Sequence, residues 1–72
     1  MTDSWTISHF SQSNPSGAGQ GNVAALLRRV AASIEELGEV EVQDVTFHGE
    51  IDDDGNPWPH MTVYFHRPDA EQ

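Results

Sequence analysis

Histidine and carboxylate side chains recur at two-residue spacings in the second half of the chain. His48 and Glu50 precede an acidic segment, and His60 and His66 follow it. Residues two apart in a β-strand point to the same face of the sheet. Imidazole and carboxylate together form a ligand set that suits Zn²⁺ or a similar transition metal. A metal site made by His48, His60 and Glu50 is therefore one hypothesis, and histidines that meet solvent or a protein interface are the favoured alternative.

Two segments of alternating apolar and polar residues predict the β-hairpin that positions these side chains. They cover residues 40–51 and 58–66, and the acidic segment 52–57 between them has the composition of a turn. The alternation changes phase within the first segment, which predicts a β-bulge near residues 43–44. The hairpin should therefore have one apolar face and one polar face.

The register of this hairpin decides which polar side chains become neighbours. Opposite residues of an antiparallel pair point to the same face, so Phe47 can be paired with Val63 on the core side. This register brings Glu50 opposite His60, whereas a shift by one pair keeps the polar face and changes the partners. The predicted polar face carries Asp44, Thr46, His48, Glu50, His60, Thr62, Tyr64 and His66.

Other chemical interpretations have less support. His60 and Glu50 are residue types for acid–base catalysis, but the sequence offers neither a nucleophile nor a third orienting group, so we expect no enzyme and no cofactor. The glycine-rich segment 17–21 precedes a helix but lacks the Gly-Lys-Ser/Thr ending of a phosphate-binding loop, and we interpret it as a connector. Residues 50–55 imitate the start of a calcium loop, yet Met61 occupies the position of the bidentate glutamate.

Three further side chains are candidates for contacts with a partner. Arg28 and Arg29 lie in a predicted helix with no acidic residue four positions later to pair with, and arginine is enriched in protein interfaces. Solvation of that helix face is the alternative. Trp58 lies between two prolines at the hairpin tip, where it either packs over the edge of the core or anchors a partner.

The remaining elements follow from the spacing of apolar residues and from residues typical of turns and helix caps. A short strand over residues 4–10 precedes a Gly/Ser-rich loop over 11–21 that has no apolar anchor. Apolar residues at spacings of three and four predict an amphipathic helix over 23–37, with Asn22 as its N-cap and Gly38 as its stop. Residues 68–72 should fray.

These elements predict an α+β fold, a two-layer β-α-β-β sandwich in which one amphipathic helix packs on a three-stranded sheet. The sequence leaves open whether the first strand pairs with the second or with the third. One helix can cover one face of such a sheet, so the polar hairpin face should meet water or another chain.

Composition excludes several classes of function. The 72 residues carry a net charge of −9, from twelve acids against three arginines, and contain no lysine and no cysteine. An excess of acids opposes binding to nucleic acid or to an anionic membrane, whereas a basic protein partner fits it. Disulfides and thiolate sites are excluded. The chain begins without the basic and apolar regions of a signal peptide, and we expect a cytoplasmic location.

The sequence thus favours a small acidic, non-enzymatic interaction or accessory module. A chain of this size buries only about 60% of its extended surface, so association would add needed stability, and we expect a homodimer. The contacts should come from Trp58, Arg28, Arg29 and the polar hairpin face with His48, His60, Tyr64 and His66. The alternative is a small-ligand or metal-binding protein that uses the same histidines.

Overall fold

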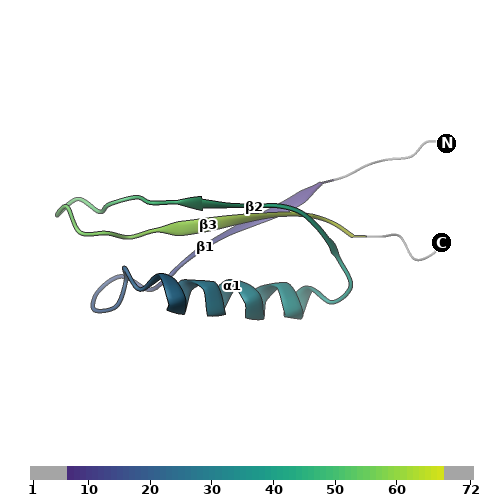
Figure 1. Cartoon of the computed structure of the whole chain (residues 1–72), viewed down its shortest axis with the longest axis horizontal. Helices are drawn as coiled ribbons and strands as arrows, with labels where there is room; N and C mark the ends of the chain where they lie inside the picture. The colour runs from purple at the N-terminus through teal and green to yellow at the C-terminus, as the bar shows by residue number, and fades with distance from the viewer. Residues whose placement is uncertain (1–6, 68–72) are drawn as a thin grey trace.

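The described part of the chain folds as one helix on one face of a three-stranded antiparallel sheet (Figure 1). The computed structural model describes residues 7–67, so residues 4–6 of the predicted first strand and the predicted frayed tail 68–72 lie outside the described residues. The elements are β1 (Ser8–Ser13), α1 (Val23–Leu37), β2 (Glu41–His48) and β3 (His60–His66). The predicted α+β class and the β-α-β-β order are confirmed.

Helix α1 covers the predicted residues because both of its ends are capped as the sequence indicates. The Asn22 side chain accepts a hydrogen bond of 3.0 Å from the Ala25 backbone N–H. At the other end Gly38 adopts a φ of 82°, which favours glycine, and its N–H donates to the Glu35 carbonyl. Arg67 donates to the Leu37 carbonyl at 2.9 Å, which places a cation at the helix C-terminus.

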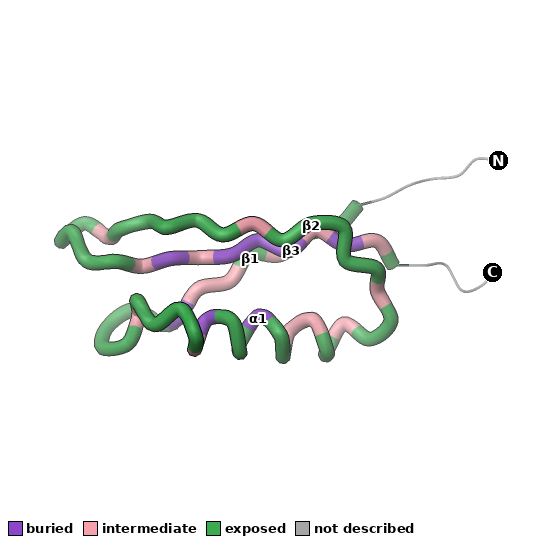
Figure 2. The backbone as a smooth tube through the Cα atoms, in the orientation of Figure 1, coloured by how far each residue is buried: buried purple, intermediate pink, exposed green. Residues whose placement is uncertain are grey.

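The strand order is β1-β3-β2, which settles the pairing that the sequence left open. β3 lies in the centre, and both of its neighbours run antiparallel to it. Its inward side chains Met61, Val63 and Phe65 are buried against Leu26 and Val30 of α1. Figure 2 shows that burial is concentrated on β3 and on one stripe of the helix, while β2 is largely exposed.

The hairpin register differs by one pair from the predicted one. Phe47 pairs with Met61 rather than with Val63, and the bulge lies between Val42 and Asp44, where the sequence predicted it. The turn explains the difference. The Asp52 carboxylate accepts hydrogen bonds of 2.9 Å from the backbone N–H groups of two later turn residues, 54 and 56. This interaction closes the turn around residue 54, one residue earlier than the predicted centre.

The segment between β1 and α1 has an anchor that the sequence analysis missed. β1 extends to Ser13, and the next residue, Asn14, is 3% exposed. Its side-chain amide N–H group donates to the carbonyls of Gly19, Gln20 and Asn22 at 3.4, 3.2 and 2.9 Å. The loop therefore lacks an apolar anchor, as the sequence indicates, but a buried polar side chain holds it in place instead.

Candidate interaction surfaces

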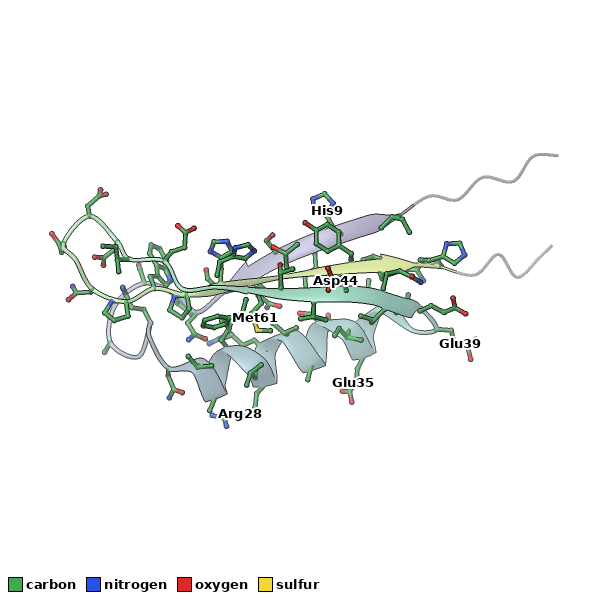
Figure 3. All side chains as sticks on the ribbon, turned by 45° about the horizontal axis from the view of Figure 1, so that its top comes forward. His9, Arg28, Glu35, Glu39, Asp44 and Met61 are labelled. Carbon is green, nitrogen blue, oxygen red and sulfur yellow. The ribbon has the colours of Figure 1, made fainter. Side chains whose placement is uncertain are left out.

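The sheet face that points away from α1 is polar, and we call it the histidine face. Three rows of side chains cross it from β1 through β3 to β2, because each row consists of residues paired in register. His9 shares this face with the predicted histidines, and Figure 3 shows it on the side of the sheet opposite to the helix. The rows are His9, Tyr64 and Asp44; Ser11, Thr62 and Thr46; and Ser13, His60 and His48.

Side chains on the histidine face contact one another. The rings of His48 and His60 stack with their centroids 4.7 Å apart and their planes at 17°. His9 lies against Tyr64 at a centroid distance of 5.6 Å. The hydroxyls of Ser11 and Thr62 are 2.8 Å apart, which gives the buried Thr62 a hydrogen-bond partner. The face is thus an ordered polar surface.

The actual register changes the neighbours of the predicted metal ligands. His48 lies opposite His60, whereas Glu50 lies beside Trp58, whose backbone N–H donates to the Glu50 carbonyl at 2.8 Å. Within residues 7–67 no group of three or more histidines, cysteines and acids is gathered closely enough to hold a metal ion. The structure brings together two of the three predicted ligands, so metal binding stays a hypothesis that depends on the histidine pair.

Trp58 borders a shallow hollow on the histidine face. Its indole N–H donates to the Asn14 carbonyl at 2.8 Å, and the side chain is half-buried. The ring is therefore held by the loop that precedes α1, and its contact with a partner stays a prediction. The hollow has a volume of about 320 Å³ and is lined by Ser11, Gln12, Ser13, Glu50, Ile51, Trp58 and His60.

The two helix arginines have different environments. Arg29 donates from Nε to the Asn14 side-chain oxygen at 3.1 Å, so it helps to hold the loop after β1. The prediction that this arginine is unpaired is wrong, because a residue remote in sequence supplies the acceptor. Arg28 is exposed on the side of the helix that faces away from the sheet (Figure 3).

Helix α1 lies over β1 and β3 and leaves β2 uncovered. Its Cα atoms come within 8 Å of those of β1 and β3 but not of those of β2. Ser33 donates to the Gln12 side chain at 2.8 Å, and this bond, like that of Arg29, ties the helix to the β1 side. A helix is about 10 Å wide and strands are about 4.8 Å apart, so one helix covers about two strands.

Apolar side chains of β2 and α1 are exposed on this side of the molecule, and the sequence analysis did not identify them. The inward side chains of β2 are exposed, with Phe47 at 52% and Val45 at 43%. Leu27 of α1 is 49% exposed and lies on the opposite side of the helix from Arg29, hence towards β2. We call this surface the apolar strip, and its members are Val23, Leu27, Val42, Val45 and Phe47. The sequence indicates such a surface because it predicts three strands with inward side chains and a single helix, which covers only about two of them.

The acidic turn at the hairpin tip is fixed to the loop before α1. The Gln20 side chain donates to the Asp52 carboxylate at 2.9 Å and to the Pro57 carbonyl at 3.1 Å. Hydrogen bonds from the Asn56 backbone and then from the Gln20 side chain hold the pKa of Asp52 below its ordinary value. This carboxylate therefore has a structural role, and calcium-loop geometry is not needed to explain it.

Comparison of the chain with protein-family models, with curated proteins and with solved structures gives no significant match. Across residues 7–67, the one helix is too short and too polar to cross a membrane. The apolar strip and the histidine face are the two surfaces of the described residues that bear on function.

Proposed function

We propose that this chain is a small, non-enzymatic protein-interaction module that acts as a homodimer and associates through the apolar strip. The observation that carries the proposal is the exposure of side chains from two different elements on one side of the molecule. Phe47 and Val45 of β2 and Leu27 of α1 are each between 43% and 52% exposed. Single exposed apolar residues are ordinary, but contiguous apolar surface on a small protein marks an interaction site.

The buried core is small, which favours association. It consists of five buried apolar side chains within residues 7–67, namely Leu26, Val30, Met61, Val63 and Phe65. A chain of this length loses only about 60% of its extended surface on folding, so its stability margin is narrow. Covering the apolar strip with a second copy would add buried area without lengthening the chain.

The histidine face and the acidic turn remain exposed when the apolar strip is covered. The histidine face lies on the opposite side of the sheet, and the turn projects from the end of the hairpin (Figure 1). The turn carries the three carboxylates of residues 52–54, and the whole chain has a net charge of −9, which favours a basic partner over an acidic one. Two copies would present both surfaces twice, which is the working arrangement that we propose for an accessory protein.

Sedimentation velocity of the full chain over a wide concentration range tests the proposal. We expect a reversible monomer–dimer equilibrium in the wild type and a weaker dimer in Leu27→Gln, which removes apolar surface from the strip. Ala32→Gln is the matched control, because Ala32 is exposed on the same helix but lies away from the strip. A wild-type chain that stays monomeric at high concentration would overturn the proposed self-association.

The hollow beside Trp58 supports a second candidate function, the binding of a small ligand or metal ion at the histidine face. The rings of His48 and His60 are stacked, and Glu50 lines the same hollow as His60, so a side-chain rearrangement would be needed for both imidazoles to bind one ion. Titration calorimetry with Zn²⁺ tests this function. Stoichiometric binding that is lost in His60→Ala but kept in His9→Ala would support it, and equal binding by both variants would contradict it.

A further inference from the structure

The two edges of the sheet differ in how they are protected. Along β1 the inward side chains are Ser8, Phe10 and Gln12; Phe10 packs against the core, and Gln12 is bonded to Ser33 of the helix above it. Along β2 the inward side chains Val42, Val45 and Phe47 are apolar and about half exposed, and the helix backbone stays farther from β2 than from β1 and β3. An uncovered edge strand exposes unpaired backbone groups and is a template for another strand. β2 is therefore the edge suited to strand addition.

Only part of β2 is regular enough to pair with another strand. The bulge between Val42 and Asp44 interrupts one end, and the strand stops at His48. The regular stretch is thus the five residues Asp44–His48, and its central residue is Thr46. A two-fold axis through this centre pairs the whole stretch with a second copy of itself.

We propose that two copies join through antiparallel pairing of β2 with β2, centred on Thr46, to form one six-stranded sheet. This inference deepens the self-association proposed above and depends on it. Val45 then lies opposite the partner's Phe47 on the apolar side of the sheet. On the other side Asp44 lies opposite the partner's His48, so that a carboxylate faces an imidazole twice in each dimer.

The neighbouring symmetric registers are less favourable. Centring the pair on Val45 brings Gln43, at the bulge, opposite the partner's Phe47. Centring it on Phe47 brings Asp44 opposite the partner's Glu50, and like charges directly opposite each other destabilise a sheet. A shift by an odd number of positions places apolar side chains opposite polar ones and cannot obey a two-fold axis.

The proposed pairing accounts for the position of the apolar strip. Both helices lie on the same side of the six-stranded sheet, and each keeps its place over β1 and β3. The paired β2 strands lie between the two helices. Leu27 of each helix therefore faces the paired strands from its own side. The two histidine faces join into one polar surface on the other side.

Disulfide cross-linking tests the register, because the natural chain contains no cysteine. Opposite residues of antiparallel strands have Cα atoms about 4.5–5.5 Å apart, within the range of a disulfide. Thr46→Cys should therefore cross-link to its own copy under mild oxidation and give a covalent dimer. Asp44→Cys and His48→Cys should each give no covalent dimer when alone and should cross-link when mixed, because copies of either residue lie about 13 Å apart in this register.

The outcomes separate this inference from the function on which it rests. A reversible dimer in sedimentation without cross-linking of Thr46→Cys or of the mixed variants would overturn the β2 pairing and leave the homodimer intact. A wild-type chain that is monomeric in sedimentation would overturn both. The mixed pair keeps the test valid if Thr46→Cys folds poorly, because Asp44 and His48 are exposed.

Discussion

Replacing Asn14 by alanine should destabilise the protein far more than its place in a Gly/Ser-rich loop indicates. The side chain is 3% exposed, donates to three backbone carbonyls and accepts from Arg29 at 3.1 Å. Its two N–H groups contribute about 1 kcal/mol each, and the bond from the charged guanidinium contributes about 1.5–3 kcal/mol. We expect a loss of about 3–5 kcal/mol in the free energy of unfolding.

That loss is large relative to the stability available. A 72-residue domain at about 0.05–0.15 kcal/mol per residue has roughly 4–11 kcal/mol in total. Asn14→Ala should therefore be marginally stable or unfolded at room temperature. The helix would lose its tie to the loop, and the carbonyl that holds the Trp58 indole would lose its fixed position.

Urea unfolding followed by circular dichroism measures the effect. All variants are compared at one protein concentration, because dimerisation would couple to unfolding. Asn22→Ala is the matched control, since this asparagine caps α1 with a single side-chain bond and its loss costs about 1 kcal/mol. If Asn14→Ala lost no more stability than Asn22→Ala, the assignment of Asn14 as the anchor of the loop would be refuted.

Three further predictions concern the dimer and the acidic turn. Phe47 exposes 52% of a side chain of about 200 Å², so two copies bury up to about 200 Å², worth up to about 5 kcal/mol. If half of this free energy stabilises the dimer, Phe47→Thr should raise the dimer dissociation constant about 70-fold. Ile7→Thr, near the opposite edge, should leave the dissociation constant measured by sedimentation unchanged. Equal constants for both variants would remove Phe47 from the interface. Raising the ionic strength from about 0.01 to about 0.15 M shortens the Debye length from about 30 to about 8 Å. This screens the repulsion between two chains that each carry a net charge of −9, so the dimer dissociation constant should fall. A higher dissociation constant in salt would contradict this. For Asp52, hydrogen bonds to the carboxylate lower its folded-state pKa, so they stabilise the turn above the ordinary carboxyl pKa and are lost as the pH falls through the lowered pKa. An NMR titration should place this carboxyl below ordinary aspartates, and an ordinary value would show that the bonds from Asn56 and Gln20 do not persist in solution.

Much of the local structure followed from the sequence because it depends on neighbouring residues. The helix 23–37 was predicted to the residue, since the apolar period and the caps Asn22 and Gly38 act within one or two turns. The bulge near residues 43–44 followed from a change of phase in the alternation. The positions of His48, His60 and Tyr64 on one face of the sheet followed from strand periodicity alone. A register shift by one pair changes their partners but not the face to which they point.

Interactions between residues remote in the sequence could not be predicted from the sequence. The anchoring of Asn14 depends on carbonyls and a guanidinium that approach it only when the helix is in place. The hairpin register depends on a turn closed by the Asp52 carboxylate, where the sequence offered several turn residues of similar preference. A register shift by one pair changed the cross-strand neighbour of Glu50 from His60 to Trp58.

The sequence by itself determined a small acidic α+β domain, with one helix and a hairpin of one apolar and one polar face. Periodicity and composition are sufficient for these features, because they depend on the order of residue types along the chain. Only the tertiary structure decided that β3 is central and that the helix lies towards β1. The apolar strip follows from that placement, because which side chains stay exposed is set by where the single helix lies on the sheet.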